Sequence, residues 1–239
     1  MTATGTKQPG CFVPGNKATG LFCSLRTRST GPELLDLETP PPPERARIAG
    51  YLAFVNRWLG GTAAVAHHLR HVREPVSVLD VAAGAADIPR ELARRNPHLK
   101  CVAFDLSEWM LALAAGVPRI RGDVRWFPFR DRSVDYVIAT HFFHHLTDEQ
   151  IVSVLREFDR VARRGIIVND LIRNRRALAW IKVLTLWANR YVRYDGPQSV
   201  RKAFRAEEIE ALARKAGLDW LRVTRHFAHR FTLAGERRT

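Results

Sequence analysis

A chain of 239 residues is long enough for one substantial α/β domain and too short for two ordinary ones. Hydrophobic residues make up 46% of it, but no uninterrupted apolar run approaches the roughly 18 residues that a membrane span needs. The N-terminus has no basic start followed by an apolar stretch, so we expect a cytoplasmic protein rather than a secreted one.

The formal net charge is +14, from 38 basic and 24 acidic residues. A charge of this size attracts polyanions, which raises nucleic acid or an anionic membrane surface as partners. The basic residues are scattered among Ala and Leu rather than clustered. We therefore interpret them mainly as an arginine-rich surface, do not favour a nucleic-acid partner, and leave peripheral membrane contact open.

The three cysteines predict neither a metal site nor disulfides, because the spacing of Cys11, Cys23 and Cys101 matches no zinc motif and no even framework. Residues 1–43 are rich in Gly, Thr, Ser and Pro and end in "TPPPP". We interpret them as a disordered leader and a Pro-rich spacer ahead of a single domain at residues 44–239.

The domain is expected to begin with two short helices within residues 44–75. In "ERARIAGYLAFVNRWLGG", apolar residues recur at helical spacing and two glycines end the pattern; the stripe consists of Ile48, Tyr51, Leu52, Val55 and Leu59. "TAAVAHHLRHV" forms the second helix. Both precede the first strand, where they would cover its end as a lid.

From Val76 onward, strand and helix patterns alternate with short links. The expected strands are "VSVLDVA", "KCVAFDL", "VDYVIATHF" and "GIIVNDL", with helices between them, one opened by Thr147 as N-cap. Such alternation predicts a doubly wound, mostly parallel sheet. Near the C-terminus, "WLRVTRHF" and "HRFTLAG" predict an antiparallel strand pair at the sheet edge.

One segment, residues 173–204, interrupts the alternation. In "ALAWIKVLTLWANRYV" the polar residues recur every three or four positions, which predicts an inserted amphipathic helix with Trp180 and Trp187 on its apolar face. This face would pack on the core, form a wall of a substrate pocket or contact a membrane surface. Asp195, Gly196 and Pro197 then indicate a turn that returns the chain to the sheet.

Acidic residues lie where the strands end, which is where parallel sheets bind ligands. The first strand gives Asp80 and an Ala-Ala-Gly-Ala-Ala turn, the second gives Asp105, and Asp123 precedes "VDYVIATHF". A single Asp in such a place is also typical of a turn or a helix cap.

The segments "VLDVAAGAAD", "FDLSEWML", "GDVRWFPFRDRSVDYV" and "FFHHL" occur in order between Val76 and Leu218. Together they resemble the class I S-adenosylmethionine-dependent methyltransferases, in particular the small-molecule branch that includes ubiquinone and menaquinone biosynthesis enzymes. "VNDL", the basic amphipathic helix and "DGPQSVR" resemble bacterial enzymes that tailor polyketides or phenolic lipids. The resemblance implies a Rossmann-like seven-stranded α/β sheet in which the inserted helix is a substrate cap.

The same resemblance implies S-adenosyl-L-methionine as cofactor; we expect no metal, because no zinc-type grouping accompanies the histidines of "THFFHH". Its methionine end would lie at Asp80 and the turn backbone, its ribose at Asp105 and its adenine at Asp123; the full set of cofactor residues is Asp80, Ala82, Gly84, Asp105, Leu106, Asp123 and Val124. Ala82 and Ala86 depart from the family's glycines, where a methyl group restricts positive φ. We expect cofactor binding to survive this change.

Methyl transfer to a phenol needs a base, and an imidazole with a pKa near 6.5 can serve at neutral pH. The candidates are His144, then His145 and His141. The alternative is that the His pair caps the helix that begins near Thr147, or packs beneath the cofactor. On the substrate side the candidates are Asp170, Trp180 and Trp187, Asp170 being equally typical of a turn.

The sequence therefore predicts methyl transfer to a small aromatic or lipid-tailed acceptor in secondary metabolism, with O-methylation of a phenol ahead of C-methylation of a quinone precursor. An RNA methyltransferase is a further alternative, although an Asn/Asp-Pro-Pro-aromatic signature is missing where "THFFHH" stands. A non-catalytic cofactor-binding protein is the last one, and it rests on the two missing glycines.

Overall fold

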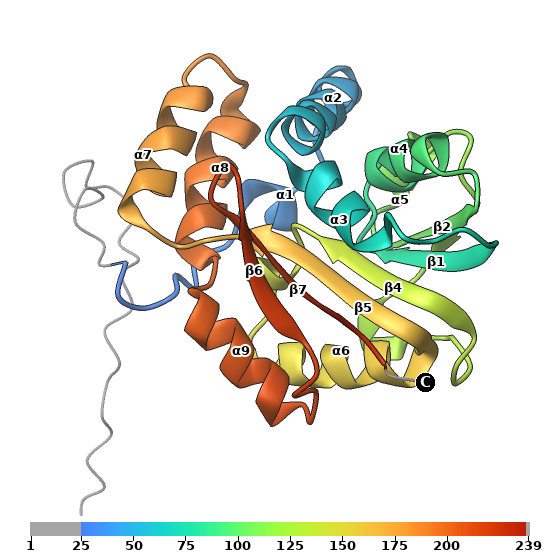
Figure 1. Cartoon of the computed structure of the whole chain (residues 1–239). Helices are drawn as coiled ribbons and strands as arrows, with labels where there is room; N and C mark the ends of the chain where they lie inside the picture. Colours follow the sequence, from blue (N-terminus) through green and yellow to red (C-terminus); the bar gives the residue numbers. More distant parts are fainter. Residues whose placement is uncertain (1–24, 238–239) are drawn as a thin grey trace, which may run out of the picture.

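The sheet determines the architecture, which the computed structural model describes for residues 25–237 (Figure 1). Seven strands lie in the order β3-β2-β1-β4-β5-β7-β6. Their bounds are β1 Val76–Val81, β2 Leu99–Asp105, β3 Arg119–Arg121, β4 Val134–Thr140, β5 Ala162–Leu171, β6 Arg222–His226 and β7 Arg230–Glu236. β1 to β5 pair in parallel, whereas β7 is antiparallel to both β5 and β6. The predicted Rossmann-like sheet with an antiparallel pair at one edge is confirmed.

Helices cover both faces of this sheet (Figure 1). They are α1 Leu34–Leu37, α2 Pro42–Trp58, α3 Gly61–Leu69, α4 Asp87–Arg95, α5 Glu108–Ala112, α6 Asp148–Val161, α7 Arg175–Leu184, α8 Arg190–Lys202 and α9 Ala206–Lys215, with short 3-10 turns η2 Val124–Trp126 and η3 Phe143–His145. No helix in residues 25–237 is long and apolar enough to cross a membrane.

Two hydrophobic cores follow from the alternation of side chains along the strands. On one face Val76 and Val78 of β1 pack with α3 and α4, and Cys101 is buried there. On the other face Leu79 and Val81 pack with α6 and α9. The sheet is therefore buried on both sides, and its strand ends are fixed relative to each other.

The inserted segment differs from the single helix that the sequence predicts. It forms two helices, α7 and α8, because the Thr185 hydroxyl donates back to Ile181 O at 2.8 Å and the Asn189 side chain caps α8 by accepting from Val192 N. The turn predicted at Asp195 to Pro197 is wrong, since these residues lie inside α8.

Packing explains why a turn signal lies within a helix. A Cβ on Gly196 would come within 3.1 Å of Ile181 Cγ1 and Thr185 Cγ2, so the glycine allows α8 to approach α7 closely. Long-range contact thus overrides the local preference of the Asp-Gly-Pro sequence.

Residues 25–43 differ from the expected disordered leader. The Arg28 guanidinium donates to Lys202 O at 2.9 Å and to Leu146 O at 2.8 Å, and it forms an ion pair with Asp148. We call residues 25–38 the N-terminal strap, because they run across α8 and η3. The rest of the predicted leader, including Cys11 and Cys23, lies outside the described residues.

Asp195 fixes the strap to α8. Its carboxylate accepts hydrogen bonds from the backbone N–H groups of Leu34 at 2.6 Å and Leu35 at 3.2 Å. These contacts span about two thirds of the chain, so no local pattern signals them. The strap is ordered by partners that come from the inserted segment.

We predict that Asp195→Ala lowers the free energy of unfolding by about 1–3 kcal/mol, because two partly buried N–H groups lose their acceptor. Thermal and urea unfolding measure the change. Tyr194→Ala, at the exposed neighbouring position of the same helix, is the matched control and should change stability much less. Equal effects of the two variants would show that Asp195 does not hold the strap.

Candidate active site

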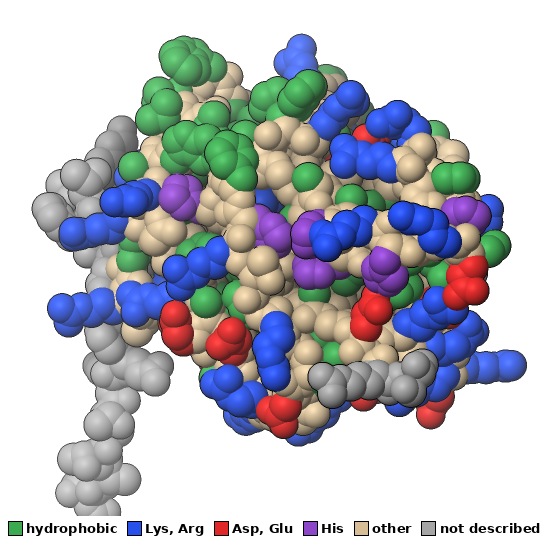
Figure 2. Space-filling view, viewed as in Figure 1, with side chains coloured by type: hydrophobic (Ala, Val, Ile, Leu, Met, Phe, Trp, Pro, Cys, Tyr) green, Lys and Arg blue, Asp and Glu red, His purple; other side chains and the backbone are tan. Residues whose placement is uncertain are grey.

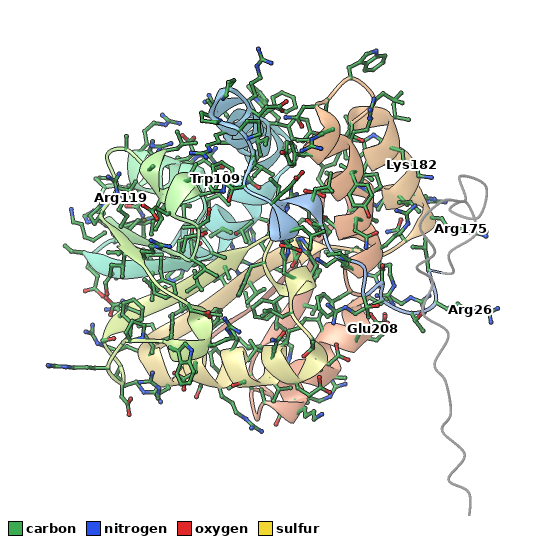
Figure 3. All side chains as sticks on the ribbon, turned by 180° about the vertical axis from the view of Figure 1, so that it is seen from behind. Arg26, Trp109, Arg119, Arg175, Lys182 and Glu208 are labelled. Atoms are coloured by element: carbon green, nitrogen blue, oxygen red, sulfur yellow. The ribbon has the colours of Figure 1, made fainter. Side chains whose placement is uncertain are left out.

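A cavity of about 540 Å³ lies at the carboxyl ends of β1, β2 and β4. Helix α2 and helices α7 and α8 contribute apolar walls, and Trp109 of α5, labelled in Figure 3, contributes another. The cavity collects most of the predicted site residues: Asp80, Ala82, Gly84, Asp105, Leu106, Asp123, Val124, His141, His144 and His145 all line it. The parallel strand order therefore brings these residues together, as the sequence predicts.

The turn after β1 keeps the conformation of a glycine-rich loop although alanine replaces two of the three glycines. Ala82, Gly84 and Ala86 have φ values of 57°, 55° and 56°, all in the left-handed region. An alanine there carries a steric cost that glycine avoids. The backbone shape that the resemblance implies is thus retained, at the expense of strain at two alanines.

Asp105 connects this turn to the end of β2. Its carboxylate accepts from the backbone N–H of Gly84 and from that of Ser107, each at 2.7 Å. Burial raises the pKa of Asp105, although these backbone hydrogen bonds act in the opposite direction. Because a carboxylate has about four lone-pair positions, Asp105 keeps acceptor capacity for ribose hydroxyls.

The methionine end of the predicted cofactor site contains buried polar atoms that lack partners. Within residues 25–237, Oδ1 of Asp80, Oδ1 of Asn56 and Oγ1 of Thr140 accept or donate no hydrogen bond, and all three residues line the cavity. Burial, followed by the charges of Asp87 and Asp105, raises the pKa of Asp80 well above its usual range. A bound ammonium group would relieve this cost, so these residues fit the cationic amino-acid end of S-adenosylmethionine.

The predicted adenine end of the cofactor site, at Asp123, is more exposed than the methionine end at Asp80. The Asp123 carboxylate accepts from the backbone N–H of Arg125 at 2.9 Å and pairs with the Arg125 guanidinium, which lowers the pKa of Asp123. Val124 lies between them and also lines the cavity. An adenine amino group would compete with Arg125 for this carboxylate.

A buried Asp–His pair lies on the acceptor side. Nδ1 of His144 is 2.8 Å from Oδ1 of Asp170, and the His144 backbone N–H donates to Oδ2 at 3.1 Å. Burial lowers the pKa of His144, but the charges of Asp170 and Glu33 outweigh it and the net pKa is raised. The pKa of Asp170 is lowered despite its burial, because His144 contributes charge and a hydrogen bond. Asp170 itself does not line the cavity; its side chain contacts His144, which does.

The N-terminal strap surrounds the other side of this pair with charge. Oε1 of Glu33 lies 3.6 Å from Nε2 of His144 and 3.2 Å from Nζ of Lys202, while Nδ1 of His145 lies 3.1 Å from Oδ1 of Asp36. Glu33, His144 and His145 bring donor atoms within 4.8 Å of one another, the spacing of a metal site. The Lys202 ammonium already supplies a cation to Glu33, so we interpret the group as a charge cluster.

His141 has a different environment. Its Nε2 contacts the guanidinium of Arg230, which is buried and also donates to Leu59 O at 2.9 Å. Burial and then the Arg230 charge lower the pKa of His141 well below its usual range. His141 is neutral with its Nε2 lone pair engaged, which leaves His144 as the better placed imidazole.

The structure separates the two predicted tryptophans from the cavity. Trp180 is 37% exposed and Trp187 is 88% exposed, and neither lines it; Ile181 and Val192 of the same segment do. Because adjacent helical residues point about 100° apart, Ile181 faces inward where Trp180 faces out. Sequence reasoning also missed Glu33, Asn56 and Arg230, whose roles depend on long-range contacts.

The sheet order, the left-handed turn after β1 and the acidic residues at three strand ends define the class I methyltransferase fold. Residues 78–165 match the family model described as a methyltransferase domain. The fold is that of the class I S-adenosylmethionine-dependent methyltransferases, and the family match covers a little over a third of the chain.

Sequence relatives agree over part of the chain. A demethylmenaquinone methyltransferase of Thermotoga maritima is 38% identical over 94 residues, which is 38% of this chain and 40% of the relative. The match thus spans less than half of that relative's length.

Solved structures share the fold at low identity. A SAM-dependent methyltransferase from Aquifex aeolicus has a TM-score of 0.61 at 18% identity, covering 83% of this chain and 99% of its own. An O-methyltransferase family 2 protein from Planctomyces limnophilus, in complex with apigenin, also has a TM-score of 0.61, at 14% identity, with 84% and 62% covered. At such identities the likeness is one of fold.

We predict that Ala82→Gly raises the free energy of unfolding by about 0.5–1 kcal/mol, because glycine adopts the positive φ without the methyl clash. Urea unfolding measures the gain. Ala83→Gly, in the same turn but without a positive φ, is the control and should give no gain. A loss of stability in Ala82→Gly would contradict strain at this position.

We predict that Asp105→Asn weakens the affinity for S-adenosylhomocysteine by about 1.5–3 kcal/mol, the scale of charge-assisted hydrogen bonds. Calorimetric titration measures it. Glu108→Gln, an exposed carboxylate nearby, is the control and should leave the affinity unchanged. Unchanged affinity in Asp105→Asn would remove this residue from the cofactor site.

Proposed function

We propose that the protein transfers a methyl group from S-adenosylmethionine to a small aromatic or lipid-tailed acceptor, most readily to a phenolic hydroxyl. The observation that carries this proposal is the Asp170–His144 pair at the wall of the same cavity that contains Asp80 and Asp105. When bound, the cofactor supplies an electrophilic methyl group on a sulfonium. One cavity would then hold cofactor, acceptor and a proton acceptor together.

The apolar lining of the cavity beyond the predicted cofactor residues, which we call the acceptor half, supports an apolar substrate. Beyond the cofactor residues the cavity is walled by aliphatic and aromatic side chains from α1, α2, α5, β5, α7 and α8 and from the residue before η3: Leu35, Ile48, Tyr51, Leu52, Val55, Trp109, Phe142, Leu171, Ile181 and Val192. Such a lining excludes water and stabilises a ring or a hydrocarbon chain. A few polar groups, His144 among them, would orient the hydroxyl.

In this proposal, the proton of the phenolic hydroxyl would be accepted by Nε2 of His144. Asp170 binds Nδ1–H of His144, which fixes the tautomer whose Nε2 carries a lone pair on the side of Glu33 and the cavity. As the phenol oxygen gains the methyl group, its proton would pass to Nε2, and Asp170 would stabilise the imidazolium. His144 would be the catalytic base and Asp170 a positioning residue.

C-methylation of a quinone precursor is the second candidate, and the sequence likeness to demethylmenaquinone methyltransferases favours it. In that reaction the nucleophile is an activated ring carbon, and a proton leaves the ring after transfer. His144 would accept that proton instead. Screening phenols and hydroquinones, with the methylated position assigned by NMR, separates the two candidates: an O-methyl product would support the first and a C-methyl product the second.

We predict that turnover rises with pH through an apparent pKa above 6.5, because the pKa of His144 is raised and only its neutral form accepts a proton. Asp170→Asn removes the negative charge that raises the pKa of His144. The increase of turnover with pH should therefore occur at lower pH and reach a lower plateau. Initial rates between pH 5 and pH 9, with the most active acceptor found, measure both profiles.

His144→Ala should lower kcat by about 100-fold or more while leaving cofactor affinity within a few-fold. His71→Ala, on the surface beside Glu236, is the control and should retain activity. Loss of cofactor binding in His144→Ala would assign this residue to structure rather than to catalysis. An unshifted pH profile in Asp170→Asn would show that the pair does not set the rate.

A further inference from the structure

Large apolar side chains lie exposed around the end of the α7–α8 hairpin. Trp187 is 88% exposed, Val183 57%, Leu186 53% and Trp180 37%. We call these four residues the apolar tip. In Figure 2 hydrophobic side chains gather over this end of the molecule, where α7 and α8 meet in Figure 1. Burying even a few such side chains is favourable enough to hold a protein on another surface.

Neighbouring elements extend this surface. The ring of Phe227, in the turn between β6 and β7, lies 6.2 Å from that of Trp180 and is 72% exposed. On α2, Phe54 and Trp58 are also more than half exposed. Three separate elements thus present aromatic side chains to solvent.

The charge of the segment indicates what the apolar tip contacts. Residues 171–194 contain no Asp or Glu and six basic residues: Arg173, Arg175, Arg176, Lys182, Arg190 and Arg193. Arg173 and Arg190 pair with Glu208 and Glu38, whereas the other four form no ion pair with acidic side chains in residues 25–237. Lys182 and Arg175 extend outward from α7 in Figure 3.

We propose that the apolar tip inserts into the surface of an anionic lipid bilayer, with the unpaired basic side chains of α7 and α8 contacting the headgroups. Exposed tryptophan and leucine beside lysine and arginine, without acidic residues, is the combination that binds such interfaces. A protein partner or a second copy of the chain would need no such excess of positive charge.

This surface also bears on the proposed function, although it does not depend on it. α7 lines the cavity with Ile181, between Trp180 and Lys182, and α2 lines it with Leu52 and Val55, next to Phe54. The two helices that would touch the bilayer are therefore the walls of the acceptor half. An acceptor with a lipid tail would pass from the membrane into the cavity between them.

The test is co-sedimentation of the full chain with vesicles, without cofactor or acceptor, so that its outcome is independent of methyl transfer. We expect binding to vesicles of phosphatidylcholine with phosphatidylglycerol, weaker binding to phosphatidylcholine alone, and weakening by salt. The double variant Leu186→Ser with Trp187→Ser should lower the partition coefficient about tenfold or more. Trp126→Ser, an 81% exposed tryptophan on η2, is the matched control and should bind as the parent does.

Charge is tested separately. Lys182→Glu should weaken binding to the anionic vesicles about fivefold or more, whereas Arg130→Glu, which changes the net charge equally in the loop before β4, should have a much smaller effect. Circular dichroism verifies that each variant is folded. Lack of binding by the parent chain, or equal binding by the double variant, would overturn the proposal. Light scattering that shows a dimer broken by the double variant would assign the apolar tip to self-association instead.

Discussion

The structure around the cavity depends on one buried charge, the carboxylate of Asp170 at the end of β5. A fully buried carboxylate stays ionised only where hydrogen bonds and positive charge replace water. Here His144 supplies both through its ring and backbone N–H, and the backbone N–H of Leu171 adds a bond at 2.7 Å. His144 in turn faces Glu33, and Glu33 faces Lys202 of α8. These alternating charges connect β5, η3, the N-terminal strap and the inserted segment. The contacts that stabilise the buried Asp170 carboxylate therefore also hold together the elements on the His144 side of the cavity.

A second buried charge, the guanidinium of Arg230, also connects elements that lie far apart in the sequence. Arg230 at the start of β7 donates to Leu59 O after α2 and contacts His141 and Asn169 at the ends of β4 and β5. Burial lowers the pKa of Arg230 to about 10, so the guanidinium remains protonated at neutral pH. Arg230 thereby connects the C-terminal end of α2 to the antiparallel edge of the sheet. The antiparallel pair, which the sequence predicts only as an edge, also supplies a cation to the centre of the molecule.

Local pattern predicts what local forces determine. The strand β1, the N-cap Thr147 of α6, and the acidic strand ends at Asp80, Asp105 and Asp123 were all visible in the sequence, because each depends on neighbours within a few residues. The strap and α8 were not, since the N–H groups of Leu34 and Leu35 find their acceptor in Asp195. The sequence did not predict that Ile181, rather than Trp180, faces the cavity. Which side of α7 faces the cavity depends on how the helix packs on the rest of the molecule. The alanines at 82 and 86 show the converse case, where the fold imposes on two residues a conformation that their own chemistry disfavours.

The distribution of charge separates the cavity from the rest of the surface. The chain carries +14, yet in residues 25–237 the cavity is lined by seven acidic residues and one arginine, Arg125; the acidic residues are Glu33, Asp36, Asp80, Asp87, Asp105, Asp123 and Asp195. An acidic cavity favours a cationic cofactor and disfavours an acceptor that must bring phosphates with it. The positive excess therefore lies outside the cavity, and four basic side chains of that excess without an acidic partner in residues 25–237 lie on α7 and α8, the two helices that the apolar tip joins. A nucleic-acid acceptor would be attracted by the outer surface and repelled by the acidic cavity, whereas the neutral acceptor proposed above, held at a lipid surface, would be repelled by neither.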